Sequence, residues 1–225
     1  MNIHVKDNVK PASGLSRRSL LKAGAGLAIG VYIAKSGRVF AQAPAATPPN
    51  IAPNTFLIIK PDNTVTVLCK HIEFGQGPFT GMATLVAEEL DADLSQMRAD
   101  HAPSNPVLYK NLLFGVQGTG GSSAIANSFI QMRQVGAAAR EMLVATAAKE
   151  WNVPATEVTV ENGVIKHPSG KQGRFGEFAE KANQMPVPAN PKLKDPSQFK
   201  FIGKEGVVKR LDSAEKSNGT AEYTL

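Results

Sequence analysis

The sequence predicts an α+β fold in which β-hairpins and a mixed sheet are packed by two main helices. Short β-branched runs separated by turn residues occur within 56–70 and 157–167, as expected of hairpin strands. Two longer segments, 78–90 and 123–151, repeat apolar residues at spacings of three and four, which is typical of amphipathic helices. Elements of both kinds are expected to surround one core.

The hairpin strands are predicted at 56–60 and 65–70, joined by a Pro-Asp-Asn-Thr turn. A second pair is predicted at 157–161 and 163–167, where Asn-Gly is the strongest short hairpin signal in the chain. The other expected elements are a strand at 96–102, a loop at 103–121 and a short helix at 175–182.

The first predicted helix begins at Pro78, a residue suited to the first helical turn, and its apolar face includes Met82, Val86 and Leu90. Four carboxylates crowd its end, where they oppose the helix dipole. We interpret them as a solvated face rather than as a metal cluster. They are Glu88, Glu89, Asp91 and Asp93.

The second predicted helix, 123–151, would be about 40 Å long. Its small residues at 136–139 predict close packing against a sheet or another helix. Its apolar face comprises Ile125, Phe129, Met132, Gly136, Ala139, Leu143 and Ala147.

Residues 1–41 have the pattern of an export signal. A polar start leads into Ser-Arg-Arg-Ser-Leu-Leu-Lys at 16–22 and then into an apolar run at 23–34, which is shorter than the roughly 20 residues of a membrane span. Ala41 or Ala43 would supply the small residue before a cleavage site. The paired arginines resemble a twin-arginine signal, so we expect periplasmic export and no integral membrane segment. A buried or membrane-anchoring helix is the alternative.

The positive charge of the chain belongs to this signal. Seven of the 25 Lys and Arg residues and one of the 19 Asp and Glu residues lie in 1–41, which leaves 18 of each in 42–225. We therefore expect no nucleic-acid partner. Cys69 is the only cysteine, which excludes an internal disulfide and a cysteine-held iron–sulfur cluster or zinc finger within this chain.

The remaining chain divides into four parts by composition. Residues 42–54 form a Pro- and Ala-rich tether, and 55–183 form the main domain. Four prolines mark a connector over 184–205. Residues 206–225 have the character of the start of another unit and end on a strand-like run without a partner. We therefore expect the chain to be truncated.

Two glycine-containing turns, each followed by a helix, are the candidate binding features. Gly75 and Gly77 flank Gln76 and allow a sharp turn, and the next helix would offer free N–H groups to an anion. A Gly- and Ser-rich loop at 118–123 leads into the second helix in the same way. Neither turn is specific alone: the first lacks the G-x-G-x-x-G spacing, and the second has the composition of a simple helix cap. Together they predict a ligand site.

Other catalytic chemistry is not supported by the sequence. His71 and Glu73 form an H-x-E pair as in zinc deaminases, but the required P-C-x-x-C partner is absent. Neither G-x-S-x-G nor H-E-x-x-H occurs. Packing or surface roles are favoured for Cys69, His101, Trp151 and His167.

Four motifs occur in order along the chain. They are H-I-E-F-G-Q-G-x-x-T at 71–80, A-E-E-L-D-A-D at 87–93, G-T-G-G-S-S at 118–123 and R-Q-V-G-A-A-A-R-E-M-L at 133–143. This series resembles the molybdenum-binding subunit of the xanthine dehydrogenase/aldehyde oxidase family, and most of all its isoquinoline 1-oxidoreductase beta-subunit branch. The resemblance covers about 54–225, and the tail resembles the start of the family's a/b hammerhead domain.

The resemblance implies a cofactor and its contacts. Gln76, with Gly75 and Gly77, matches the turn that binds the pterin of a molybdopterin dinucleotide, expected here as the molybdenum-loaded cytosine dinucleotide. Gln134 matches a family glutamine, although a polar helix face explains it equally well. No residue of this chain is assigned as a metal ligand. The loop that holds phosphate and pterin is matched by Thr119, Gly120, Gly121, Ser122 and Ser123.

The family's Phe-Gly-Gly segment and the catalytic glutamate of its G-x-G-E-like motif are absent from this sequence. We therefore assign no catalytic residue and expect the cofactor-binding amino-terminal portion of a molybdenum hydroxylase large subunit. The intact enzyme would hydroxylate an N-heteroaromatic or aldehyde carbon with oxygen from water. Its partners would be the remainder of the large subunit and a separate [2Fe–2S] subunit. The alternative is an exported, non-catalytic binding or interaction module that retains the fold.

Overall fold

The computed structural model describes residues 56–221 and three short strands before them, β1 (Leu27–Ile29), β2 (Tyr32–Ile33) and β3 (Val39–Phe40). The predicted tether and the rest of the predicted export signal lie outside the described residues. In the described part of the chain, no helix combines the length and apolar character that crossing a bilayer requires.

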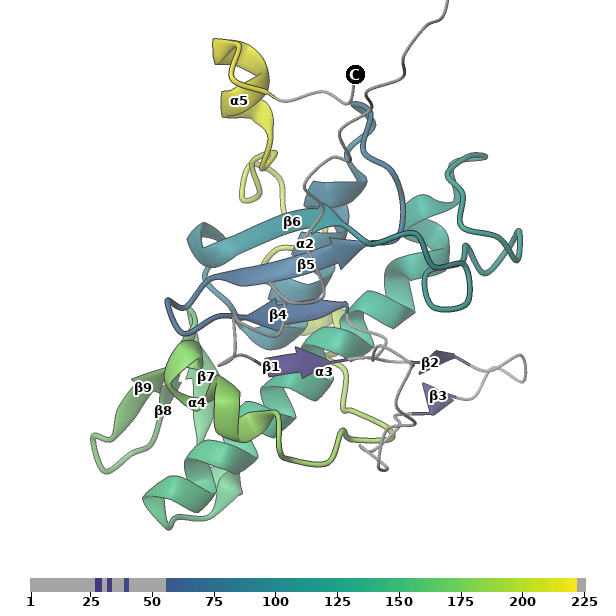
Figure 1. Cartoon of the computed structure of the whole chain (residues 1–225). Helices are drawn as coiled ribbons and strands as arrows, with labels where there is room; N and C mark the ends of the chain where they lie inside the picture. The colour runs from purple at the N-terminus through teal and green to yellow at the C-terminus, as the bar shows by residue number, and fades with distance from the viewer. Residues whose placement is uncertain (1–26, 30–31, 34–38, 41–55, 222–225) are drawn as a thin grey trace, which may run out of the picture.

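The main sheet is mixed, as predicted, with the strand order β1-β4-β5-β6. β4 (Leu57–Ile59) and β5 (Val65–Cys69) form the predicted hairpin, and β1 pairs antiparallel with the other edge of β4. β6 (Met97–His101) pairs with β5 in parallel, because α2 (Pro78–Leu90) crosses over between them. Figure 1 shows α2 and the long helix α3 (Ser123–Trp151) behind this sheet.

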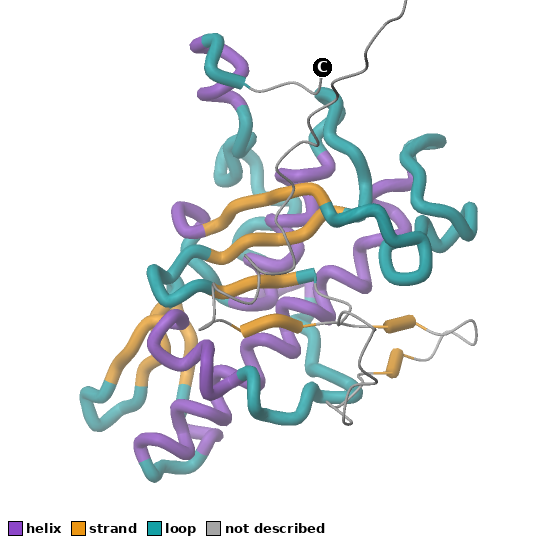
Figure 2. The backbone as a smooth tube through the Cα atoms, in the orientation of Figure 1, coloured by secondary structure: helices purple, strands orange, loops and turns teal. Residues whose placement is uncertain are grey.

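A second, three-stranded sheet follows α3 and lies apart from the main sheet in Figure 2. Its first two strands are the predicted Asn-Gly hairpin, and the third strand was not predicted. The predicted short helix is confirmed as α4, and the tail contains a further helix, α5. The bounds are β7 (Thr159–Glu161), β8 (Val164–Lys166), β9 (Gln172–Arg174), α4 (Phe175–Ala182) and α5 (Ser213–Asn218).

Close packing of α2 on α3 depends on Gly136. A Cβ atom at this position would lie 2.5 Å from the Val86 carbonyl oxygen and 3.0 Å from the Glu89 Cβ. The predicted close approach at the small residues of α3 is therefore confirmed, and the partner is a helix. Most of the predicted apolar face of α3 is buried, but Ile125 near its start is exposed.

The interpretation of the acidic residues at the end of α2 as a solvated face was wrong for Glu88 and Glu89. Glu88 and Glu89 are fully buried. The Glu88 carboxylate accepts hydrogen bonds from the N–H groups of Lys200 (2.9 Å), Phe201 (2.7 Å) and Ile202 (3.0 Å). Sequence reasoning missed this because the donors are backbone groups more than 100 residues away.

The connector and α3 supply the partners of the remaining carboxylates. Glu89 forms a buried ion pair with Arg133 (2.7 Å) and accepts the Lys194 N–H (3.0 Å). The Lys194 ammonium lies 2.8 Å from Asp91, and Arg133 stacks over the Phe199 ring at 4.9 Å. These partners offset the free-energy cost of burying the carboxylates. The same contacts hold the connector against the end of α2. No group of His, Cys, Asp and Glu side chains within the described residues is arranged to hold a metal ion.

A group of buried polar side chains connects the end of β5 to α3. Lys70 and His71 are 3% and 1% exposed, respectively. The Lys70 ammonium donates to Gln131 Oε1 (2.8 Å), and the Asn127 amide nitrogen lies 3.1 Å from His71 Nε2. Burial lowers the pKa of Lys70 to about 8, and burial together with the nearby Lys70 charge lowers the pKa of His71 to about 4. His71 is therefore neutral at pH 7, with Nε2 accepting from Asn127.

Replacing Glu88 by glutamine should lower the free energy of unfolding by about 2 to 3 kcal/mol, because the amide turns one acceptor into a donor that faces N–H groups. Urea denaturation of the full chain measures this loss. Glu180→Gln removes an exposed carboxylate on α4 and should change stability by less than about 0.5 kcal/mol. Equal unfolding midpoints for the two variants would contradict the role given to Glu88.

His71 should make the stability of the chain depend on pH. The unfolded chain protonates this histidine near pH 6.5, whereas the folded chain resists protonation down to about pH 4. The stabilisation is fully present above pH 6.5 and is lost as the pH falls towards 4, by about 3 kcal/mol in total. Urea denaturation at a series of pH values measures the slope.

The control for this prediction is His71→Gln, which retains a hydrogen-bond acceptor for Asn127 without a titrating group. The carboxylates titrate in both proteins and cancel in the difference between them. An identical pH slope in the variant would show that His71 is not the cause.

Candidate functional site

The GQG turn is built from glycine backbone angles and from the side chain of Gln76. Gly75 and Gly77 have φ angles of +116° and +93°, which other residues rarely adopt, and Gly77 is the N-cap of α2. The Gln76 amide donates to the Ile72 carbonyl (2.6 Å) and accepts from the Phe74 N–H (2.8 Å). Gln76 therefore shapes its own turn while remaining exposed.

The start of α2 offers fewer free N–H groups to an anion than expected, because a side chain of the turn already binds several of them. The Glu73 carboxylate accepts the N–H groups of Gly75 (2.7 Å), Gly77 (3.2 Å) and Phe79 (3.4 Å). It therefore occupies the position at the helix N-terminus that an anionic ligand would take. The signal for this role in the sequence is a glutamate four residues before the N-cap, close enough for the turn to fold back onto it.

The second loop is organised around Asn111, which is fully buried. Its amide nitrogen donates to Ser123 Oγ (2.8 Å), and the Ser123 hydroxyl donates to the Gly120 carbonyl (2.7 Å). Gly121 and Ser122 have φ angles of +56° and +52°, so the backbone turns sharply before α3 begins. Sequence reasoning did not identify Asn111, because it lies seven residues before the Gly-Thr-Gly-Gly-Ser-Ser motif.

The two predicted loops lie side by side. The Ile72 N–H donates to the Thr119 hydroxyl (2.9 Å). The neighbouring residue His71 contacts Asn127 in the first turns of α3. These contacts join residues 47 and 56 positions apart in the sequence. The structure therefore brings Gln76 and the Thr119–Ser123 loop onto one end of the α2–α3 pair.

Gln134 does not join this group. It lies 11 residues beyond Ser123, which is about 16 Å along α3 at the usual helical rise. It is half-buried, and its Oε1 atom is buried without a hydrogen-bond partner. The structure therefore separates Gln134 from the two loops but leaves its acceptor unused.

The glycine loops have room and polarity for a pterin and its phosphates. A Cβ added at Gly75, Gly77 or Gly120 would meet no atom within 4 Å, so the backbone at these three positions faces open space. The Thr119 and Ser122 hydroxyls and the backbone groups of this loop are hydrogen-bonding partners suited to pterin and phosphate. The Ser123 hydroxyl is buried and already bonded to Asn111 and Gly120, so it shapes the loop. These residues fit one side of a molybdopterin site.

The residues set aside by sequence reasoning have packing roles. Cys69 is buried, which raises the pKa of its thiol and makes it a poor nucleophile. His101 packs against Phe79 with ring centroids 4.6 Å apart. Trp151 packs edge-on against Phe178.

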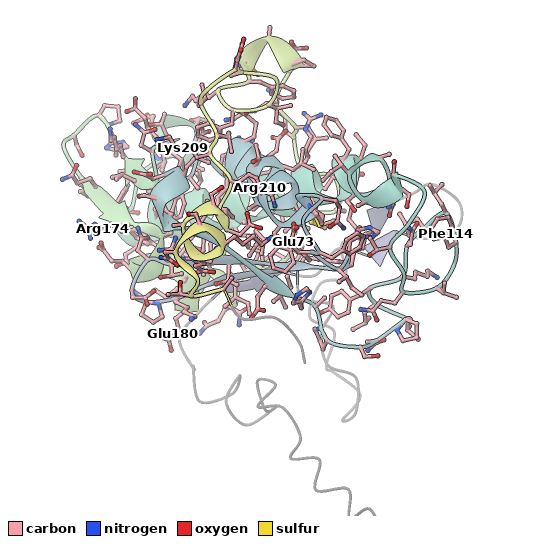
Figure 3. All side chains as sticks on the ribbon, turned by 90° about the horizontal axis from the view of Figure 1, so that it is seen from above. Glu73, Phe114, Arg174, Glu180, Lys209 and Arg210 are labelled. Atoms are coloured by element: carbon pink, nitrogen blue, oxygen red, sulfur yellow. The ribbon has the colours of Figure 1, made fainter. Side chains whose placement is uncertain are left out.

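Large apolar side chains are exposed on the GQG turn and on the loop at 103–121. The loop at 103–121, which extends beyond the sheet in Figure 2, is held by buried Asn111 and Tyr109 but turns large apolar side chains outward. Phe74 of the GQG turn is 72% exposed, and Phe114 lies at the periphery of the molecule in Figure 3. Exposed large apolar side chains in such number are typical of an interface. We call this group of side chains the apolar rim, and it consists of Ile72, Phe74, Val107, Leu113, Phe114 and Val116.

Comparison with known proteins shows the family of this chain. The model of the molybdopterin cofactor-binding domain family matches residues 6–223. Isoquinoline 1-oxidoreductase subunit beta from Brevundimonas diminuta is 31% identical over 94% of this chain and 32% of its own length. A membrane-bound aldehyde dehydrogenase (pyrroloquinoline-quinone) from Gluconacetobacter polyoxogenes is 30% identical over 98% of this chain and 29% of its own.

A solved structure, quinoline 2-oxidoreductase from Pseudomonas putida 86, is 20% identical and superimposes with a TM-score of 0.43 over 56% of this chain and 15% of that protein. The chain spans about a third of the length of the two curated relatives described above. The family match covers almost the whole chain, including both glycine loops. This protein therefore belongs to the molybdopterin cofactor-binding domain family.

Proposed function

We propose that this chain is the cofactor-binding amino-terminal portion of a molybdenum hydroxylase large subunit. The observation that carries the proposal is the hydrogen bond between Ile72 and Thr119, which joins the two family loops on one side of a site. The intact enzyme would hydroxylate an N-heteroaromatic or aldehyde carbon, with water as the oxygen source. Isoquinoline 1-oxidoreductase subunit beta and the aldehyde dehydrogenase, by their names, act on these two substrate classes.

The ligand is proposed to be a molybdopterin dinucleotide, in the cytosine form. When bound, it supplies the molybdenum centre at which substrate oxidation takes place. The chain supplies the binding surface: the GQG turn would contact the pterin, and the Thr119–Ser123 loop would hydrogen-bond to phosphate and pterin. Gln134 is proposed to contact the cofactor only if the bound ligand reaches along α3 to its unpartnered Oε1 atom.

The apolar rim is proposed to contact the remainder of a large subunit, since the curated relatives extend well beyond the matched region. A separate [2Fe–2S] subunit would carry the electrons away.

We also propose that residues 1–41 direct export to the periplasm by the twin-arginine route. Residues 55–183 would form the cofactor-binding portion, and residues 206–225 would begin a hammerhead domain.

Filling the open space at Gly120 should weaken cofactor binding without unfolding the chain. Gly120→Val places a branched side chain where no atom lies within 4 Å, so the fold should tolerate it. The dissociation constant for molybdopterin cytosine dinucleotide should rise at least tenfold, which corresponds to about 1.4 kcal/mol. Anaerobic titration followed by pterin fluorescence measures this change.

Ala155→Val is the matched control, because it adds the same side chain at an exposed position beyond the other end of α3. It should bind the dinucleotide as tightly as the parent chain. If the parent chain bound no pterin dinucleotide, even with the carboxyl-terminal part of a relative supplied, the proposed function would fail. That result would favour the exported binding module without a cofactor.

A further inference from the structure

The tail of the chain lies against the GQG turn, although about 135 residues separate the two in sequence. The Leu211 N–H donates to the Thr80 hydroxyl (3.1 Å), so the tail runs along the first turns of α2. Figure 3 shows Arg210 and Glu73 close together near α5. An open hollow of about 430 Å³ remains between Gly75 and α5. Contact with the turn is therefore made by a few specific side chains.

Two cations of the tail converge on the turn. Arg210 Nη1 donates to the Gly75 carbonyl (2.9 Å), and Arg210 Nη2 lies 3.5 Å from Glu73 Oε1. The Lys216 ammonium lies 3.7 Å from the same Glu73 oxygen. Asp212 holds both cations in place, by a bidentate pair with Arg210 (3.0 and 2.9 Å) and by a hydrogen bond from Lys216.

These charges remain in place across the physiological pH range. The hydrogen bond from Arg210 and the charges of Arg210 and Lys216 hold the pKa of Asp212 well below its usual value. Asp212 in turn raises the pKa of both basic groups. The Glu73 side chain is only 6% exposed, so its carboxylate needs the partners that it has. Those partners are three N–H groups of the turn and two cations of the tail.

We propose that Arg210 and Lys216, braced by Asp212, are positioning residues that hold the GQG turn in its ligand-binding conformation through Glu73. The helix N-terminus is already occupied by Glu73, so the turn can recognise a ligand only through its shape and its exposed groups. That shape depends on the Glu73 carboxylate, and the tail restrains this carboxylate from outside. The identity of the ligand, a pterin dinucleotide, rests on the proposed function.

Amide hydrogen exchange of the full chain without cofactor tests the restraint directly. In Arg210→Ala, the amides of Gly75 and Gly77 should exchange about threefold to fivefold faster than in the parent chain. Lys209→Ala is the matched control, because Lys209 is exposed and its loss removes the same charge. Arg210 keeps its contacts to the turn in this variant. Lys209→Ala should leave the exchange of both amides unchanged, and Arg210→Lys should restore only part of the protection because it cannot form the bidentate pair.

Glu73→Gln tests whether the tail acts through this carboxylate. The amide oxygen still accepts N–H groups of the turn, but the charge that attracts the tail is gone. The Arg210→Ala change should then have little further effect on exchange in a Glu73→Gln background. Fully additive effects of the two substitutions would overturn the proposed route through Glu73.

Binding of molybdopterin cytosine dinucleotide supplies the second readout. Arg210→Ala should raise its dissociation constant about threefold to fivefold, in step with the loss of protection, since only the ordered turn binds. Two results overturn the proposal: exchange in Arg210→Ala equal to that in Lys209→Ala, or faster exchange with unchanged affinity. If the parent chain bound no dinucleotide, the proposed function would fail, whereas hydrogen exchange would still decide whether the tail restrains the turn.

Discussion

The contact of α2 with α3 at Gly136 is the constraint on which the rest of the structure depends. No side chain separates the helices there, so the α3 backbone approaches the Val86 carbonyl directly. Each helix begins immediately after one of the glycine loops, and fixing the helices against each other therefore fixes the loops. The hydrogen bond between Ile72 and Thr119 is a consequence of this packing. A site assembled from residues 47 positions apart thus depends on a helix crossing elsewhere in the core.

Three glutamates show how the same side chain takes different roles according to its partners. Glu73 caps the start of α2 with its carboxylate, whereas Glu88 and Glu89 lie at the end of the same helix, where the dipole disfavours them. Each is buried and satisfied by N–H groups, cations or both, which offsets the cost of removing the charge from water. In all three cases distant segments supply partners: the tail for Glu73 and the connector for the other two. Segments with little regular structure therefore hold the compact part of the molecule together.

Both glycine loops lie within the match to the molybdopterin cofactor-binding domain family, and we propose that both contact the cofactor. The open space at their glycines lies where the two loops meet, and the apolar rim is formed by the GQG turn and the loop that leads into the second of them. A large polar ligand would occupy the open space at the glycines, and a protein partner would cover the apolar rim. The proposed cofactor and the proposed remainder of a large subunit therefore meet the same end of the domain, which is the expected arrangement for a cofactor held between two parts of a protein.

The sequence by itself determined the local elements of this protein. Asn162-Gly163 predicted its hairpin, apolar periodicity predicted α2 and α3, and the Gly-Gln-Gly motif predicted the turn, because each depends on neighbours within a few residues. Only the tertiary structure decided which polar groups would meet. The burial of Glu88 is not predictable from its neighbours, because the N–H groups that satisfy its carboxylate belong to residues more than 100 positions away. Hydrogen bonds between distant segments leave no periodic trace in a sequence, and this is why the elements were predictable and the partners were not.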